Sequence, residues 1–240
     1  MSLSRRRIWA IVRKELLEYR HNRFIVVGMA VIPLVFLIQP LIAVLGLTHS
    51  ASSGLAREHV LLYMLGIPAL VPGVVSASAV AGERQQGTLE PALTTPIRSD
   101  EYLLGKALAA LLPSLGVAYF VFAVFLGIVV LFAQPGIASS LIQGPDLVAQ
   151  MLFTPLLACW TIWVSIAVST RSSDVRVAQQ LSTLASLPPV FVAVVIALNV
   201  IPPTLPLAIG AAALLIVLDV LGWRVTSSLF NRERLITGIR

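Results

Sequence analysis

The sequence predicts an all-α membrane protein with six transmembrane helices. Of its 240 residues, 58% are hydrophobic and only 12% are charged, and the mean hydropathy is +0.92. Soluble domains carry about 25% charged residues. The charges are also absent in blocks, because Asp, Glu, Lys and Arg are missing from residues 24–56, 60–82, 107–133, 147–170 and 177–218. About 20 apolar residues cross a bilayer as a helix, so each block is long enough to span.

The blocks divide into six predicted spans. A helix satisfies its own backbone hydrogen bonds, which the bilayer core requires. Residues 177–218 are too many for one helix, and Pro202, Pro203 and Pro206 break this run because proline cannot continue a hydrogen-bonded helix. Two spans joined by a tight turn are therefore expected there. The predicted spans are about 24–47, 60–82, 107–133, 147–169, 180–200 and 204–223.

The basic residues predict the orientation. Sixteen of the 17 lysines and arginines fall in segments 1–23, 83–106, 171–176 and 224–240, and Arg57 alone falls in an opposite loop. Cytoplasmic loops collect lysine and arginine, so both termini are expected in the cytoplasm. We expect a multi-pass protein of a bacterial or archaeal cytoplasmic membrane. The basic residues behind the net charge of +6 lie at the ends of the spans, so a surface that binds nucleic acid is not expected.

Residues 1–23 precede the first span and form the first predicted unit, followed by a six-span domain over 24–240. The basic stretch is too long for the n-region of a signal peptide. Ile8, Val12, Leu16 and Tyr19 recur at helical spacing, with charged residues mainly elsewhere on the helix. This pattern predicts a basic amphipathic helix beside the lipid headgroups. The alternative is a simple topology signal.

The segment between the second and third spans carries turn and cap signals. Gly87 permits a sharp turn, and Thr88 can cap a short helix with Glu90 in its first turn. Thr95 precedes Pro96 and is pushed out of helical geometry, which ends that helix.

A second helix should then start with Ser99 as its cap and run through Lys106 into the third span. A short helix held crosswise between two membrane helices can transmit a push from a cytoplasmic partner. The alternative is an ordinary charged loop.

This segment resembles the coupling region of the type-2 ABC transporter permease family. Members typically carry E-R-E-x-G-T-L-E, then L-L-x-T-P, then G-K before the third span. The matching residues are Glu83, Arg84, Gly87, Thr88, Leu89, Glu90, Leu93, Thr95, Pro96, Gly105 and Lys106. Gln85 and the pair Pro91-Ala92 depart from the pattern. A weaker match, Lys14-Glu15-Leu16 with Arg20, Arg23, Phe24 and Pro33, is similar to the family's N-terminal elbow helix.

The resemblance implies a permease that works as a homodimer or heterodimer with two cytoplasmic ABC ATPase subunits. Those subunits would bind ATP and Mg, push on a coupling helix within residues 83–106, and drive export of a hydrophobic or amphipathic substrate. A second cytoplasmic contact would involve Arg171, Asp174 and Arg176. The chain has no phosphate-binding loop of its own, so it is not expected to be an enzyme or to bind a cofactor.

Other functional classes fit less well. The three histidines lie outside or at the edges of the predicted spans, and Asp219 is the one carboxylate inside them, so neither a serine nor an aspartyl intramembrane protease is expected. A single cysteine, Cys159, excludes a disulfide framework or a cysteine-rich zinc site. An ion-coupled secondary transporter, or another six-span protein without an ATPase, remains the alternative. Asp219 would be the ionisable group of such a transporter, although a structural ion pair with Arg224 is the simpler interpretation.

Overall fold

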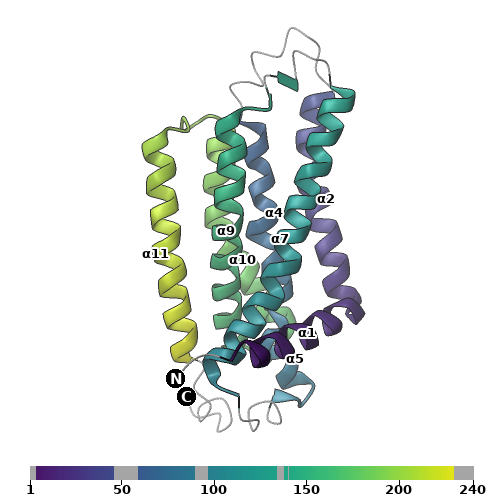
Figure 1. Cartoon of the computed structure of the whole chain (residues 1–240), viewed down its shortest axis with the longest axis vertical. Helices are drawn as coiled ribbons and strands as arrows, with labels where there is room; N and C mark the ends of the chain where they lie inside the picture. The colour runs from purple at the N-terminus through teal and green to yellow at the C-terminus, as the bar shows by residue number, and fades with distance from the viewer. Residues whose placement is uncertain (1–3, 46–58, 90–96, 134–137, 140, 230–240) are drawn as a thin grey trace.

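The computed structural model describes residues 4–45, 59–89, 97–133, 138–139 and 141–229. Within these ranges, six helical segments are long and apolar enough to cross a membrane, and no strand is formed. They stand side by side as an elongated bundle (Figure 1). The predicted all-α membrane fold with six transmembrane helices is confirmed.

Five of the six segments are single helices. They are α2 (Arg23–Leu45), α7 (Ser99–Phe132), α9 (Gly144–Arg171), α10 (Val175–Ala197) and α11 (Leu205–Leu229). Helix α10 ends three residues before the end of the predicted span 180–200, because Asn199 adopts a positive φ of 55° and turns the chain. Asparagine tolerates this left-handed conformation better than most residues.

The second span is built from three pieces and lies at the centre of the bundle. A 3₁₀-helix, η2 (Val60–Leu65), leads into α4 (Gly66–Ser76) and then α5 (Ser78–Gln85). In the most apolar 18-residue window of the second span, 83% of the residues are buried, against 0% in the same kind of window of α11. Helix α4 contacts α2, α7, α9 and α10. The other helices therefore shield the second span from the surrounding lipid.

Hydroxyl groups fix α9 against the second span. Three side chains spaced four residues apart on α9 donate to three carbonyl oxygens spaced four apart on the second span. The bonds are Thr161 to Ala69 (2.8 Å), Ser165 to Gly73 (3.5 Å) and Ser169 to Ala77 (2.7 Å). The Ser169 hydroxyl also accepts from the backbone N–H groups of Val80 and Ala81, just past the junction of α4 and α5. These bonds satisfy polar groups away from water, where each unmade bond would be costly.

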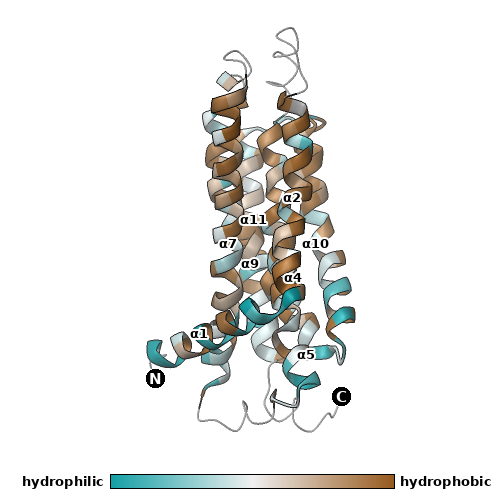
Figure 2. Cartoon of the chain, turned by 90° about the vertical axis from the view of Figure 1, so that its right-hand side faces the viewer, coloured by the Kyte–Doolittle hydropathy of each residue, from teal (hydrophilic) through white to brown (hydrophobic). Residues whose placement is uncertain are grey.

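Polarity divides the bundle along its length. Figure 2 shows mainly hydrophobic helix shafts and hydrophilic residues gathered at the end that carries α5 and the first helix, α1 (Arg5–His21). We call this the charged end, and we call the end with the turn between α10 and α11 the opposite end. Large apolar side chains such as Phe120 and Phe132 of α7 are about 70% exposed on the shaft. These are surfaces suited to lipid.

Helix α1 lies across the charged end rather than along the bundle (Figure 1). Val12 and Tyr19 of the predicted apolar stripe are buried, and the stripe packs with residues of α7 in one hydrophobic cluster. Trp9 and Leu17 face outward, 61% and 52% exposed. The predicted stripe thus contacts protein, and the outward face is the one available to headgroups.

One predicted helix cap differs in the structure, and one predicted short helix falls on residues outside the described part of the chain. The cap of α7 is Arg98 rather than the predicted Ser99, because the Arg98 backbone N–H donates to the Glu101 carboxylate (3.3 Å) and Ser99 is already helical. The short helix predicted after Thr88 falls on residues 90–96, which lie outside the described part of the chain. The Thr88 hydroxyl donates to the Glu83 carbonyl (3.4 Å), at the end of α5.

Candidate functional site

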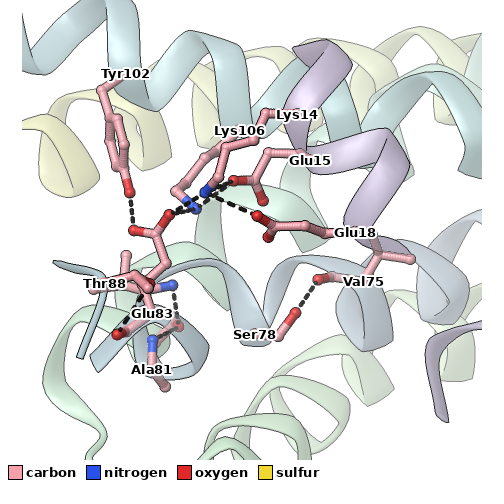
Figure 3. Close-up of polar contacts among 12 residues, drawn as sticks. Lys14, Glu15, Glu18, Val75, Ser78, Ala81, Glu83, Thr88, Tyr102 and Lys106 are labelled. Atoms are coloured by element: carbon pink, nitrogen blue, oxygen red, sulfur yellow. Dashed lines mark hydrogen bonds and ion pairs between the residues drawn. The ribbon is translucent and has the colours of Figure 1, made fainter. Parts of the chain in front are cut away.

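Three helices meet at the charged end around one buried lysine. The side chain of Lys106 on α7 is 0% exposed, and its Nζ lies 3.0 Å from Glu15 Oε1 on α1. The same Nζ lies 3.1 Å from Glu83 Oε1 on α5 (Figure 3). Because a buried unpaired charge costs several kcal/mol, the two carboxylates offset the cost of burying this ammonium group. The ion pairs tie α7 to both α1 and α5.

A second lysine reaches the same carboxylates from the solvent side. Lys14 on α1 is half-exposed, and its Nζ lies 2.9 Å from Glu83, 3.2 Å from Glu18 and 3.3 Å from Glu15. Partial burial lowers the pKa of Lys14, but the three neighbouring carboxylates outweigh this effect and raise the pKa above its ordinary value. We call Lys14, Glu15, Glu18, Glu83 and Lys106 the charge cluster.

Two tyrosines line the charge cluster. The Tyr102 hydroxyl on α7 donates to Glu83 Oε2, and the Tyr102 ring lies 5.0 Å from Lys106 Nζ (Figure 3). Tyr19 on α1 is buried nearby, where desolvation and the Glu15 carboxylate raise the pKa of its hydroxyl well above the usual value. Glu83 is therefore held from two directions, by α1 through Lys14 and by α7 through Lys106 and Tyr102.

Close backbone approach fixes α1 to α7 beyond the cluster. The Glu101 carboxylate accepts from the Ser4 backbone N–H (2.8 Å) and from the Arg7 guanidinium (3.3 Å). One turn further along α7, a Cβ at Gly105 would lie only 2.7 Å from Ile11 Cγ2 of α1. Gly105 is needed here because any larger residue would push α1 away.

Arg84, in the last turn of α5, joins this helix to the end of α9. Its Nη1 donates to the Ser172 carbonyl (2.7 Å) and its Nη2 to the Thr170 carbonyl (3.1 Å). Carbonyls at a helix C-terminus lack intrahelical donors and carry partial negative charge, so a guanidinium stabilises them. The two regions predicted to meet a cytoplasmic partner, 83–106 and 171–176, are thus in direct contact.

The turn after α5 presents an exposed surface. Gly87 has a φ of +68°, as the predicted sharp turn requires, and Gln85 and Gln86 beside it are exposed. Leu89 returns to the interior, 5% exposed, and packs in the same hydrophobic cluster as α1 and α7. The exposed turn is therefore anchored on both sides by buried residues.

The predicted site residues separate into three groups. Buried inside the chain are Glu83, Leu89, Gly105 and Lys106. Arg84 is partly buried, whereas Gly87, Thr88, Arg171, Asp174 and Arg176 are exposed, and Asp174 caps α10 by accepting from the Arg176 backbone N–H (2.7 Å). Glu90, Leu93, Thr95 and Pro96 lie outside the described residues. The buried group positions the segment, and the exposed group is free to meet a partner.

Sequence reasoning missed how α1 takes part. Glu15 pairs with Lys106 and Lys14 pairs with Glu83, yet their sequence pattern indicated only an amphipathic elbow helix and no contact with the coupling segment. Tyr102 was not singled out. One signal could have found them: Lys106 and Glu83 sit at the ends of apolar spans, where neither can face lipid without a partner.

Asp219 on α11 does not form the expected pair with Arg224 among the described residues. Its Oδ1 atom is buried and has no hydrogen-bond partner in the described part of the chain. The side chain is partly exposed overall. The expected structural pair of this carboxylate with Arg224 is therefore not formed within the described part of the chain.

Comparison with known proteins agrees with the fold. No curated protein sequence gave a match. A family described as ABC-2 family transporter protein matches residues 9–214, which include most of α1, all of segment 83–106 and five complete spans. The match extends over far more than half of the chain. The chain therefore belongs to the ABC-2 transporter family.

Proposed function

We propose that the chain is the membrane-spanning permease subunit of an ATP-driven exporter whose ATPase binds the charged end. Family membership makes it an ABC permease subunit. The observation that carries the finer proposal is the charge cluster around the buried Lys106, which joins α1, α5 and α7 directly behind the exposed turn at Gln85 and Gln86.

The charge cluster suits mechanical coupling. A force on the exposed turn reaches Glu83 within the same helix end, and Glu83 is paired to α7 and α1. Arg84 passes the same force to α9 through two carbonyls. Packed interiors are stiff, so a docked subunit would move these elements together rather than deform the turn alone.

The ATPase would be a separate subunit, present in two copies on a permease dimer. The sequence carries no phosphate-binding loop, so ATP and Mg would bind the partner. The spans offer mostly neutral side chains to a cargo, which supports a hydrophobic or amphipathic substrate. The charged end would face the cytoplasm, as the distribution of lysine and arginine predicts.

Purification in mild detergent tests the proposal. An ABC ATPase subunit should co-purify with the tagged chain, the complex should hydrolyse ATP, and the chain alone should not. Hydrolysis by the clean chain alone, or the absence of any ABC ATPase from the purified material, would contradict it.

Cysteine labelling tests the orientation separately. In a Cys159→Ser background, Val200→Cys at the opposite end should react with an impermeant maleimide added to intact cells. Ser173→Cys at the charged end should react only after permeabilisation. Both positions are exposed, so access depends on the side of the membrane. The reverse pattern would place the charged end outside and remove the ATPase from reach.

An ion-coupled carrier is the second candidate, and Asp219 is the observation that favours it. Its Oδ1 atom is buried without a hydrogen-bond partner among the described residues, and an ionisable group in a membrane helix is a functional candidate by default. Asp219→Asn should leave transport unchanged in the ATP-driven exporter. Transport driven by a proton gradient without the ATPase, and lost in Asp219→Asn, would favour the carrier instead.

A further inference from the structure

A cavity lies between α9, α10, α11 and η2, away from the charge cluster. Its volume is about 340 Å³, within the range of small-molecule sites. Its walls are apolar apart from Thr204 and the indole of Trp160, and they contain no charged side chain. The described lining therefore offers no charged group that could pair with an ionic headgroup or an ion.

A tight contact closes the cavity toward the charged end. A Cβ at Gly222 of α11 would lie 2.9 Å from the Trp163 side chain of α9, so the two helices touch there. The Trp163 and Trp223 rings meet edge to face at 5.1 Å, and the Thr226 hydroxyl donates to the Trp163 carbonyl (3.2 Å). Beyond this contact, toward the opposite end, small lining residues such as Ala211 and Ala193 leave space between the helices.

The cavity is long and narrow. Its lining runs from Ala149 to Trp160 on α9, from Ala185 to Ile196 on α10, and from Leu207 to Leu218 on α11. Each stretch spans about 17 Å at 1.5 Å per residue. This length is close to one leaflet of hydrocarbon, which is about 15 Å or half of the bilayer core.

The cross-section fits one chain rather than a protein segment. A volume of about 340 Å³ spread over about 17 Å is a narrow space. An α-helix with side chains is about 10 Å or more across, so a helix of a second copy cannot enter. An unbranched hydrocarbon chain can, and it gains dispersion contacts along three helices that an empty cavity would forfeit.

We propose that this cavity binds a single linear hydrocarbon chain, the acyl chain of an amphipath from the leaflet at the opposite end. The chain would lie parallel to α9 and α11, with its end near Trp160 and its headgroup beyond Thr204. If the cavity is also where the transported substrate binds, acyl-bearing amphipaths are the substrate class. That part of the proposal rests on the proposed function. Occupation of the cavity itself does not depend on transport.

Photolabelling in nanodiscs tests the site without any ATPase. The chain is reconstituted with phosphatidylcholine bearing a diazirine midway along one acyl chain, irradiated, and mapped by peptide mass spectrometry. Labels should concentrate on the inner half of the lining, on peptides with Trp160 or Leu215, several-fold above peptides with lipid-exposed Phe120 of α7. A diazirine fatty acid, used in parallel, shows whether bilayer lipid or a free amphiphile supplies the chain, and labelling by either supports the proposal.

A matched pair of variants separates the cavity from the general lipid surface. Ala211→Phe places a ring in the cavity, whereas Ala213→Phe adds the same ring to an exposed site on the same helix. Ala211→Phe should reduce labelling of Trp160 several-fold, and Ala213→Phe should not. Ala193→Phe on α10 repeats the test if Ala211→Phe folds poorly.

Labelling equal to that of Phe120, or labelling unchanged by both cavity variants, would overturn the site. Because the partner ATPase is absent from this experiment, that failure would leave the co-purification result intact. Conversely, strong cavity labelling with no co-purifying ATPase would reject the transport function and keep the chain-binding site.

Discussion

The two ends of the bundle are held together by different forces. At the charged end, two lysines and three carboxylates connect α1, α5 and α7, and Lys106 is fully buried. Toward the opposite end, α9, α10 and α11 line an apolar cavity, and none of the described residues in its lining is charged. Directional ion pairs specify one arrangement of helices, whereas dispersion contacts with a hydrocarbon chain tolerate several.

This difference indicates which end of the bundle can receive a force and which side can change shape in response. A force applied at the charged end acts on a closely connected unit, because Glu83 pairs with Lys106 of α7 and with Lys14 of α1, and loss of Lys106 would break a buried pair. On the apolar side, α11 is held against α9 by the contact of Gly222 with Trp163 and by the Thr226 hydrogen bond, and 0% of its most apolar window is buried. A stiff end coupled to an adaptable side is suited to converting a push into a change of cavity shape.

The largest expected effect is the loss of Lys106. Lys106→Met leaves Glu15 and Glu83 without the partner that joins α7 to both of them, and breaking a buried pair costs about 3–5 kcal/mol. Thermal unfolding in detergent should show a large drop in stability or loss of folded protein. Arg176→Met, at an exposed site, is the control and should behave as wild type. Equal stability of the two variants would mean that the cluster does not hold the charged end together.

Overpacking between α1 and α7 should have the next largest effect. Gly105→Val inserts side-chain atoms where Ile11 already lies 2.7 Å from the Cβ position, and overpacking costs about 1–3 kcal/mol. Ile11→Ala makes room, so the double variant should recover part of the loss. A double-mutant cycle in thermal unfolding measures this coupling. Strictly additive effects would show that the two helices do not touch in solution.

Lys14 offers a direct contrast with Lys106, because it pairs with two of the same carboxylates from solvent. Its side chain is 49% exposed, so Lys14→Gln should cost less than about 1 kcal/mol. The change should also depend on salt, since exposed pairs are screened. A loss as large as that of Lys106→Met would show that burial does not decide the strength of these pairs.

The smallest effect is expected on the apolar side. Ala211→Phe fills existing space, so thermal stability should stay within about 1 kcal/mol of wild type or rise slightly. A strong destabilisation would show that the cavity is closed in the membrane. That result would break the contrast between the two ends.

The sequence predicts the helices well because bilayer thickness imposes a length that hydropathy reveals. The six spans, the turn at Gly87 and the continuation of the third helix from Ser99 through Lys106 all rest on local signals. The charge cluster was not predicted, because Glu15 and Lys106 are 91 residues apart and no local pattern pairs them. The junction of α4 and α5 was missed for the same reason, since the Ser169 hydroxyl that supports it comes from α9.

Cross-linking from the exposed turn of the charged end tests most directly whether the ATPase docks there. In a Cys159→Ser background, Gln86→Cys carries a photoactivatable maleimide in the purified complex, and Val200→Cys at the opposite end is the matched control. Gln86→Cys should give an adduct with the ATPase subunit, and Val200→Cys should give none. An adduct from Val200→Cys, or none from Gln86→Cys in a complex that retains the ATPase, would contradict docking of the ATPase on the turn next to the charge cluster.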